Sequence, residues 1–232
     1  MPIRWHDRVF VTGQSSSGKS EVLNYLFSRV RPQKILLDTK GEFAIDDEKG
    51  RAIRPTRRTK DIDWEQRVIH FQELAGDLDQ YDELSWEIMQ RRNIVVCCHE
   101  LADLCDDQPN RTPKWVRQHI RKGNVFGNGW LSGSQRPVGM PRQARTEAQH
   151  VIHMVPSLDV DDHKIVAPMM RLNDYELHKH LDEAAALAQT GEFSFVWFDR
   201  RNRHSGASGL SLWPPLPDDR RRAIIVRRTA DV

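Results

Sequence analysis

Short apolar runs alternate with amphipathic stretches along most of this chain. An apolar run of about four to eight residues is typical of a buried strand, whereas apolar residues three or four positions apart indicate one face of a helix. The first pattern predicts strands at 7–12, 34–39, 68–71, 93–98, 125–134, 150–155, 192–199 and 209–212. The second predicts helices at 20–30, 74–91, 114–122, 159–167 and 173–187.

The alternation of strands and helices predicts an α/β fold with a mainly parallel central sheet flanked by helices. Residues 93–98 (NIVVCC) are apolar after the first position, which is typical of a central strand buried on both faces. The last two predicted strands are expected to pair as a late β-hairpin. We expect one domain at 1–213, with a polar and basic excursion at about 46–63, followed by a proline-rich and then basic segment at 214–232.

The composition is that of a soluble globular protein: 232 residues, of which 38% are hydrophobic and 29% charged. No apolar run approaches the roughly 18 residues that a membrane span needs, and polar residues interrupt the N-terminus where a signal peptide has its apolar core. We therefore expect a protein that is made and used in a cytosol. The three closely spaced cysteines suit such a reducing compartment.

The net charge is only +2, so the distribution of charge is more informative than its sum. One basic cluster lies at 51–60 (RAIRPTRRTK), and residues 200–232 hold eight arginines against three acidic residues. Such clusters are typical of surfaces that contact nucleic-acid phosphates, but they also occur on solvated surfaces and tails. The sequence alone leaves both interpretations open for each cluster.

The segment GQSSSGKS at 13–20 follows the first predicted strand and opens the first predicted helix. It matches the G-x-x-x-x-G-K-S pattern of a phosphate-binding loop, in which glycines let backbone N–H groups turn toward phosphate oxygens. Lys19 is expected to reach the β- and γ-phosphates, and Ser20 to ligate Mg²⁺. The pattern predicts that ATP or GTP is bound by Gly13, Gln14, Ser15, Ser16, Ser17, Gly18, Lys19, Ser20 and Glu21.

An acidic residue is expected at a strand end near this loop, where it would orient Mg²⁺ and activate the attacking water. Glu100 follows the apolar strand at 93–98 and is the candidate general base. The preceding position, usually an aspartate in such sites, is His99, which supplies no fixed negative charge at neutral pH. The carboxylate charge near Mg²⁺ is therefore assigned to Glu100 or to Asp38, which lies at the end of the second predicted strand.

A zinc site formed by Cys97, Cys98, His99 and Cys105 is an alternative interpretation of this region. The spacing of these residues does not match the usual zinc-binding patterns. Adjacent residues of a strand also point to opposite faces, so Cys97 and Cys98 are poorly placed to share one ion. We favour buried cysteines that act as small hydrophobic side chains.

Several segments follow one another in an order that resembles a known family. After the phosphate loop come LLDTKGEF at 36–43, VVCCHE at 95–100, RKGNVFGNGWLSGSQRP at 121–137 and AQHVIHMV at 148–155. Over roughly 8–212, the chain resembles the FtsK–HerA superfamily of DNA-pumping ATPases, and most of all the genome-packaging ATPases of tailless, membrane-containing icosahedral viruses. The resemblance implies a P-loop NTPase fold of the RecA/FtsK-like kind, with ATP and Mg²⁺ as cofactors.

The most specific part of this resemblance is SQRP at 134–137. The family ends this strand with a glutamine that senses the γ-phosphate, and by position this role falls to Gln135. A polar amide at the carboxyl end of a strand beside the phosphate-loop strand can also reach the nucleotide crevice on physical grounds. The alternative is a turn glutamine with no role in the site.

The resemblance further implies a ring in which each subunit inserts an arginine finger into the site of its neighbour. Such an arginine stabilises charge on the transferring phosphoryl group and accelerates transfer by roughly 10³–10⁵. Arg121 is the nearest match by position. The other candidates are Arg117, Arg136, Arg142 and Arg145.

DNA contacts are expected from the basic excursion at 51–60 and from PNRTPKW at 109–115, because lysine and arginine bind phosphates without sequence preference. The C-terminal arginines are candidates for contacts with DNA, with a capsid vertex protein or with a membrane protein of the virion. The resemblance thus implies an ATP-driven double-stranded DNA translocase that packages a viral genome, located at the packaging vertex and in the host cytoplasm. Two alternatives remain: a nucleotide-binding assembly factor of a virion or secretion channel, and a small-molecule or nucleotide kinase.

Overall fold

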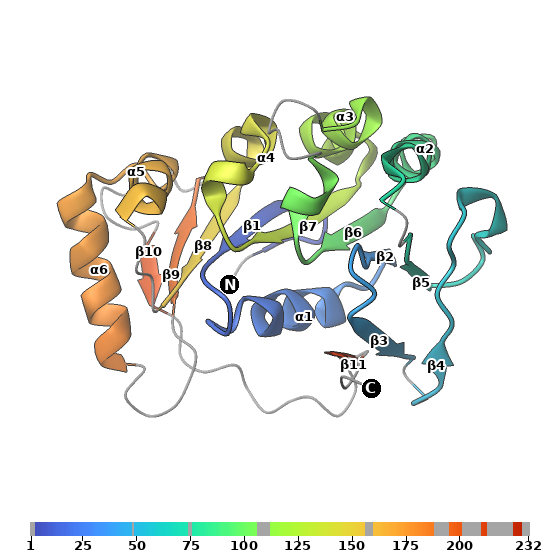
Figure 1. Cartoon of the computed structure of the whole chain (residues 1–232), viewed down its shortest axis with the longest axis horizontal. Coiled ribbons are helices and arrows are strands. Elements are labelled where there is room, and N and C mark those ends of the chain that lie inside the picture. The colour runs from blue at the N-terminus through green and yellow to red at the C-terminus, as the bar shows by residue number, and fades with distance from the viewer. Residues whose placement is uncertain are drawn as a thin grey trace.

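The computed structural model describes residues 3–47, 49–73, 76–105, 112–155, 160–187, 195–200, 210–212 and 225–228. Most of its strands form one sheet with helices on both faces (Figure 1). These strands are β1 (Arg8–Thr12), β2 (Gln33–Leu37), β5 (Val68–Phe71), β6 (Ile94–Cys98), β7 (Gly129–Ser134), β8 (His150–Met154), β9 (Phe195–Asp199) and β10 (Leu210–Leu212). Each of them overlaps a range that the apolar pattern predicts.

The strands are hydrogen-bonded in the order β10-β9-β8-β1-β7-β6-β2-β5. The pairs from β8 to β5 are all parallel, whereas β9 and β10 add antiparallel pairs at one edge. The prediction of an α/β fold with a mainly parallel sheet and a late hairpin is therefore confirmed. Because β7 pairs with both β1 and β6, it separates the strand of the phosphate loop from the strand of Glu100.

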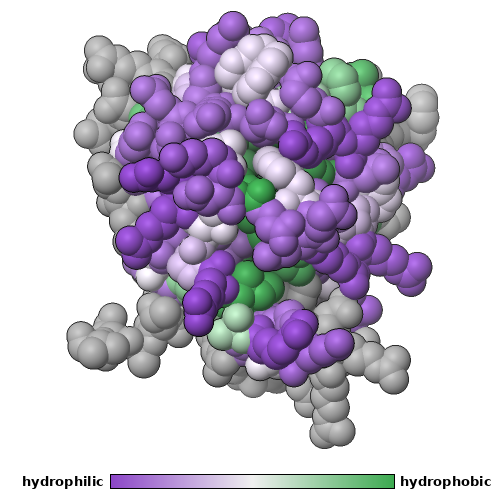
Figure 2. Space-filling view, turned by 90° about the vertical axis from the view of Figure 1, so that its right-hand side faces the viewer, coloured by the Kyte–Doolittle hydropathy of each residue, from purple (hydrophilic) through white to green (hydrophobic). Residues whose placement is uncertain are grey.

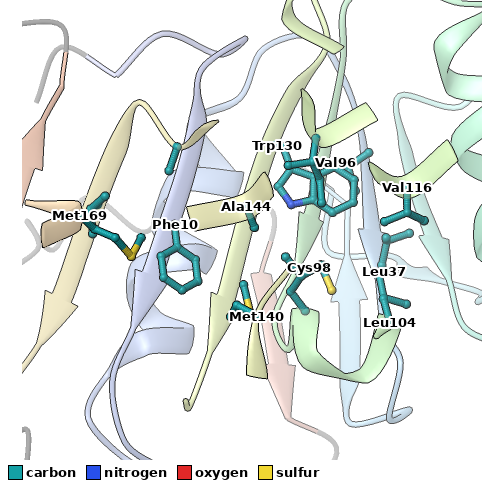
Figure 3. Close-up of a cluster of buried hydrophobic side chains, with 14 of the residues drawn as sticks. Phe10, Leu37, Val96, Cys98, Leu104, Val116, Trp130, Met140, Ala144 and Met169 are labelled. Atoms are coloured by element: carbon teal, nitrogen blue, oxygen red, sulfur yellow. The ribbon is translucent and has the colours of Figure 1, made fainter. Parts of the chain in front are cut away.

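Successive residues of the central strands point to opposite faces of the sheet, and each face has its own core. Val9 and Val11 pack with the apolar side of α1 (Lys19–Arg29). The opposite face is covered by α2 (Leu78–Met89), α3 (Lys114–Lys122), α4 (Arg142–Glu147), α5 (Val160–Met169) and α6 (Asp174–Leu187) (Figure 1). Figure 3 shows the core on that face, with Phe10, Trp130 and Cys98 on three adjacent strands.

A second, small sheet is an element that the apolar pattern does not predict. Its strands are β3 (Phe43–Asp46), β4 (Ala52–Ile53) and β11 (Ile225–Arg228), in the order β11-β3-β4. β11 belongs to the basic C-terminal segment and pairs antiparallel with β3. Part of this segment is therefore attached to the sheet that follows β2.

The predicted strand at 125–134 begins only at Gly129, because Gly123–Phe126 forms a 3₁₀ turn. Asn128 N donates to the Gly123 carbonyl of this turn (2.9 Å). The Asn128 side chain attaches the turn to its neighbours, because it accepts a hydrogen bond from Ile94 N and donates one to the Ile88 carbonyl. The other 3₁₀ turns of the described residues are Thr59–Asp61, Leu101–Leu104 and Pro137–Gly139. The predicted proline-rich break at 214–217 lies outside the described residues. None of the described helices has the length and apolar character that a membrane crossing requires.

Candidate nucleotide-binding site

The carboxyl ends of the parallel strands meet at one edge of the sheet, and the predicted site residues lie there. β1 leads into the phosphate loop, β7 into Gln135, β6 into Glu100 and β2 into Asp38. A cleft at this edge is lined by Lys19, Ser20, Leu37, Asp38, Thr39, Lys40, Glu42, Phe43, His99, Glu100 and Gln135. The fold thus brings the predicted lysine, serine, carboxylates and glutamine into one cleft.

The phosphate loop connects β1 to α1 through two residues with left-handed backbone angles. Gly18, which precedes the first residue of α1, has a φ of 88°, and Ser16 has a φ of 63°. Glycine adopts this conformation readily, which explains the glycine directly before Lys19. Within the loop, Ser17 N donates to the Gln14 carbonyl (3.3 Å). The loop therefore folds back ahead of the helix, whose N-terminal N–H groups favour a bound anion.

Lys19 is buried, and its side chain crosses the backbone of β7 at Gly133. A Cβ atom added to Gly133 would lie 3.2 Å from Lys19 Cδ and 2.6 Å from the carbonyl oxygen of His99. A side chain at this position would collide with the backbone of His99 and also crowd the lysine, which explains the glycine two residues before Gln135. Among the residues predicted to bind the nucleotide, Ser15, Ser16 and Glu21 are exposed.

Glu100 and Gln135 are in direct contact. The backbone N–H of Gln135 donates to Glu100 Oε2 (3.2 Å). The strand ahead of Gln135 is connected to the phosphate loop as well, since Gly13 N donates to the Ser134 carbonyl (3.4 Å). Glu100 is half-buried, whereas Gln135 is exposed and lines the cleft. The two predicted catalytic residues therefore lie on one hydrogen-bonded path to the loop.

Asp38 is 1% exposed and lies within hydrogen-bond distance of four donors. Its Oδ1 accepts from Glu42 N (3.1 Å), and its Oδ2 contacts Phe43 N (3.1 Å), His70 Nε2 (3.1 Å) and Gln72 Nε2 (3.4 Å). Burial alone raises the pKa of this carboxyl group, but the hydrogen bonds from His70 and the two backbone N–H groups outweigh burial and lower the pKa. Asp38 therefore braces the loop after β2, and little of its accepting capacity is left for the predicted role as a Mg²⁺ ligand.

His99 occupies the position where such sites usually carry an aspartate. It is 6% exposed, and its ring packs on Phe43 with ring centroids 4.1 Å apart. Phe43 opens β3 and donates its backbone N–H to Asp38, so this ring contact connects the end of β6 with the braced loop. His99 thus contributes to the wall of the cleft by packing.

Several residues of this region are not identified by the sequence patterns: His70, Gln72, Thr39, Lys40 and Asp103. Thr39 Oγ1 donates to Asp103 Oδ2 (2.6 Å), and Lys40 Nζ lies 3.9 Å from the same oxygen. The available signal was the pair of polar residues in VIHFQ at 68–72, because a polar side chain in a buried strand requires a partner. That signal does not say which partner the fold supplies.

All three cysteines are buried; Cys97 and Cys98 pack in the cores of the sheet, whereas the Cys105 thiol also donates to the Leu101 carbonyl (3.2 Å) and accepts from Thr112 Oγ1 (3.5 Å). Cys97 joins the core on the α1 side of the sheet and Cys98 the core on the opposite side, which confirms that the two residues point apart. Burial raises the pKa of all three thiols, that of Cys105 to about 11. Among the described residues, no group of histidine, cysteine and acidic side chains is arranged to hold a metal ion.

No protein-family model and no curated protein matches this chain. Solved structures match nearly all of it. The genome-packaging NTPase B204 from Sulfolobus turreted icosahedral virus 2, in complex with AMPPCP, has a TM-score of 0.65 at 16% identity, over 92% of this chain and 100% of that one. In complex with sulfate it has a TM-score of 0.68 at 14% identity, over 92% and 98%. B204, the DNA-packaging ATPase from Sulfolobus turreted icosahedral virus, has a TM-score of 0.63 at 13% identity, over 91% and 98%. The chain has the fold of the viral genome-packaging NTPases.

Arg121 lies near the amino end of β1, whereas the nucleotide cleft lies at the carboxyl ends of the strands. It is exposed in the last turn of α3, and its carbonyl accepts a hydrogen bond from Arg8 Nη1 (2.8 Å). Arg8 begins β1, and the phosphate loop follows the other end of that strand. Arg121 is therefore a full strand length away from the cleft of its own chain. Its role as a finger for a neighbouring subunit stays a prediction.

The other candidates for the arginine finger differ in their exposure. Arg136 is exposed directly after Gln135, at the cleft edge of the sheet. Arg142 is exposed on α4, whereas Arg117 on α3 and Arg145 on α4 are half-buried. Burial, together with the charge of Arg142, lowers the pKa of Arg145. Exposure thus favours Arg121, Arg136 and Arg142 for contacts with another molecule.

The basic excursion is attached to the main sheet of the packaging-NTPase fold. Thr56 forms a bridge with Phe71 on β5, and Thr59 hydrogen-bonds to Gln80 on α2. A cleft of about 770 Å³ lies here, away from the phosphate loop, and its charged lining residues are Asp47, Lys49, Arg51, Arg54, Asp61, Asp63 and Arg67. Figure 2 shows this side of the molecule, which is largely hydrophilic around a few hydrophobic side chains. The surface is of mixed sign, and its contact with DNA stays a prediction.

Residues 109–111 of the other predicted DNA-contacting segment lie outside the described residues. In its described part, Lys114 Nζ lies 4.7 Å from the centroid of the Trp115 ring. Trp115 packs on Trp86 of α2 with ring centroids 4.4 Å apart, and Trp86 is 39% exposed. This corner of the packaging-NTPase fold therefore combines a cation with two aromatic rings at the surface.

Proposed function

We propose that this protein is an ATP-driven double-stranded DNA translocase that packages a viral genome into a preformed capsid. The observation that carries the proposal is the contact between Glu100 and Gln135 in a cleft that is also lined by Lys19 and Ser20. A phosphate loop serves many nucleotide enzymes, whereas a glutamine at this strand end is specific to the resemblance with DNA pumps. The shared fold with a genome-packaging NTPase and a DNA-packaging ATPase supports the same activity.

Three residues of the cleft, Lys19, Ser20 and Glu100, have surroundings that suit phosphate and metal chemistry. Lys19, at the N-terminus of α1, binds the β- and γ-phosphates. Ser20 and Glu100 are the residues that would hold Mg²⁺, which neutralises charge on the phosphates. Of the two carboxylate oxygens of Glu100, Oε2 accepts a hydrogen bond and Oε1 accepts none from the described residues. Oε1 can therefore take the proton of the attacking water.

Gln135 is placed to couple hydrolysis to the rest of the protein. Its side chain lines the cleft, where it can bind the γ-phosphate, while its backbone N–H donates to Glu100. When the γ-phosphate leaves, the Gln135 side chain would lose its partner, while the backbone N–H would keep its hydrogen bond to Glu100. The resulting shift would pass to Arg136 and to the 3₁₀ turn Pro137–Gly139 that follows.

We further propose a homo-oligomeric ring in which Arg121 completes the site of the neighbouring subunit. Arg121 is exposed at one edge of the sheet and the cleft lies at the other, an arrangement that suits head-to-tail assembly. DNA would contact the segments 51–60 and 109–115, and a capsid vertex or membrane protein of the virion would dock the ring. The protein would then act at the packaging vertex and in the host cytoplasm.

An ATPase assay with and without double-stranded DNA, run beside a mass measurement of the assembly, tests this proposal. We expect a ring whose turnover is stimulated by DNA. Lys19→Ala should abolish tight nucleotide binding, because it removes the phosphate-binding cation, whereas Lys179→Ala on the exposed side of α6 should not. If the ring assembles but its ATPase rate is the same with and without double-stranded DNA, the proposal of translocation is contradicted.

Mixed rings test the position of the arginine finger. Lys19→Ala and Arg121→Ala subunits should each be inactive alone. Together they should regain part of the activity, because an intact Arg121 then serves an intact phosphate loop. A mixture of Lys19→Ala and Glu100→Gln subunits is the control, and it should stay inactive because no subunit has a complete cleft. If the first mixture were equally inactive, the finger would have to be sought among the other exposed arginines.

One observation favours a second candidate, a nucleotide-binding assembly factor. His99 replaces the usual aspartate, and Asp38 lies within hydrogen-bond distance of four donors, so fewer carboxylate oxygens would be available to hold Mg²⁺ than in a typical motor. Nucleotide binding would then shape an oligomer without driving transport. Virion production that survives Lys19→Ala would favour this function over the motor.

A further inference from the structure

A second lysine lies in the nucleotide cleft, and the motifs do not account for it. Lys40 is the second residue after Asp38, and it lines the cleft together with Lys19, Ser20 and Glu100. Its side chain is 42% exposed. Lys40 is therefore accessible to a ligand that Lys19 binds from the other side.

The backbone around Lys40 is held in place by its neighbours. Asp38 accepts from the backbone N–H groups of Glu42 and Phe43, at 3.1 Å each, so the loop is closed on itself. Thr39 Oγ1 donates to Asp103 Oδ2 at 2.6 Å, which attaches the loop to the 3₁₀ turn after Glu100. The loop is thus braced on both sides of Lys40 by contacts within the chain.

The side chain of Lys40, by contrast, is held only loosely. Its Nζ lies 3.9 Å from Asp103 Oδ2, which is longer than a hydrogen bond. Exposed ion pairs of this kind contribute little, because the lysine is well solvated and loses side-chain entropy when it is held. Lys40 can therefore leave Asp103 for a more strongly charged partner at small cost.

The charge of the cleft indicates what that partner is. Among the described residues that line it, the cationic side chains are Lys19 and Lys40, and the acidic ones are Asp38, Glu42 and Glu100. A nucleoside triphosphate adds several negative charges to this acidic surrounding. Mg²⁺ would offset part of this charge, and a further cation beside the phosphates is favourable; besides Lys19, the one that the described lining supplies is Lys40.

We propose that Lys40 is a second phosphate-binding lysine, which rests beside Asp103 and moves to the terminal phosphate when ATP binds. This inference rests on the proposed function, since it assumes that the cleft binds ATP. The preference for the terminal phosphate follows from the strand order: β2, which leads to Lys40, pairs with β6, which leads to Glu100, whereas β7 and β6 lie between β2 and β1 with its phosphate loop. The lysine then helps to distinguish ATP from ADP.

The test compares dissociation constants for ATP and ADP, each with Mg²⁺, in the full chain. Lys40→Ala and Lys40→Gln should weaken ATP about tenfold, as expected for a lost charge-assisted contact, and change ADP less than about twofold. Asp103→Asn should instead lower the dissociation constant for ATP about two- to threefold, because the carboxylate no longer competes for Lys40. The amide oxygen of the asparagine can still accept from Thr39. Lys179→Ala is the matched control and should change neither constant.

The outcomes separate this inference from the proposed function. If Lys19→Ala loses both nucleotides while the two Lys40 variants keep the wild-type ratio of ATP to ADP affinity, the role of Lys40 is refuted and the site stands. A weaker binding of ATP by Asp103→Asn would likewise overturn the resting position beside Asp103. If Lys19→Ala binds both nucleotides normally, the proposed function fails, and the inference about Lys40 falls with it. Thermal unfolding of the two Lys40 variants should match the wild type, because the Lys40 side chain is exposed.

Discussion

Two carboxylates at the ends of paired strands have opposite surroundings. Asp38 follows β2, is 1% exposed and has four hydrogen-bond donors around its two oxygens. Glu100 follows β6, which pairs with β2, and is half-buried with one hydrogen bond from Gln135 among the described residues. One carboxylate is fixed by the fold, and the other is free to meet a ligand.

The difference shows that a position after a buried strand does not by itself make an acid catalytic. A carboxylate surrounded by donors has few lone pairs left for a metal ion or a water molecule, so its role is to hold the backbone that donates to it. Asp38 holds Phe43 and, with it, the loop that carries Lys40 into the cleft. Glu100 has an oxygen, Oε1, that accepts no hydrogen bond from the described residues. We expect substitutions at the two positions to change different properties.

The largest effect is expected for Glu100→Gln. The glutamine oxygen can still accept from Gln135 N, but it cannot take a proton from water, so turnover should fall about 10²- to 10⁴-fold while the ATP dissociation constant changes less than about threefold. Steady-state ATPase rates and equilibrium binding check the two parts separately. Glu83→Gln, on the exposed side of α2, is the control. An ATPase rate within tenfold of the wild type would remove Glu100 from the role of general base.

Asp38→Asn should act mainly on stability. The amide group carries two hydrogens into a site lined by donors, and the charge that His70 and the backbone N–H groups stabilise is lost, so we expect the free energy of unfolding to fall by about 2–4 kcal/mol. Urea unfolding monitored by tryptophan fluorescence measures it.

Asp47 offers a matched control, because it also accepts from backbone N–H groups and from an arginine, but near the surface. Asp47→Asn should therefore destabilise the protein clearly less than Asp38→Asn does. Equal losses of stability at the two positions would mean that burial is not what distinguishes Asp38. A drop in turnover as large as that of Glu100→Gln, without loss of stability, would instead place Asp38 at the metal.

The contrast between these carboxylates also shows what the sequence can predict. The phosphate loop and Glu100 are identified by local patterns, because a turn before a helix and an acid after an apolar strand are encoded by neighbouring residues. The function of Asp38 depends on His70 and Gln72, which reach it only because β5 pairs with β2. No local pattern contains that pairing, so the sequence predicts the residue but not the hydrogen bonds that hold it, and its role at the metal stays a prediction.

The same limit applies to two other features of the fold. β11 has only four residues, of which two are arginines, and its strand conformation comes from pairing with β3. Arg121 is placed in a helix by its spacing, but the spacing does not tell which edge of the sheet the end of that helix reaches. Both features depend on contacts between distant segments, and both required the structure.

The pH dependence of unfolding sharpens the comparison further. Hydrogen bonds lower the pKa of Asp38 below its ordinary value of 3.8, so its stabilising contribution is complete above that value and is lost as the pH falls through the lower, folded pKa. The stability difference between the wild type and Asp38→Asn should therefore be constant down to about pH 4.5 and shrink at more acidic pH.

Groups that do not contact Asp38 change the stability of both proteins alike and cancel in this difference. Burial lowers the pKa of His119 and His153 to about 3, so the unfolded chain binds protons first and both proteins lose stability as the pH falls below about 6.5. Urea unfolding of the two proteins between about pH 3.5 and 7 measures the difference directly. A difference that grows on acidification would show that Asp38 is not stabilised as a carboxylate.

The smallest effect is expected at His99, between the two acids. His99→Asp adds a carboxylate to a cleft whose metal-facing charge comes from Glu100, so turnover at limiting Mg²⁺ should stay at the wild-type level or rise, by no more than about threefold. The protein without nucleotide should lose about 1 kcal/mol of stability, because the ring contact with Phe43 is lost. His99→Asn is the matched variant, since it has the same shape without the charge and should show the loss of stability but no gain at low Mg²⁺. If the two variants have equal turnover at every Mg²⁺ concentration, the metal is not within reach of position 99, and Glu100 bears the acidic function of this strand end alone.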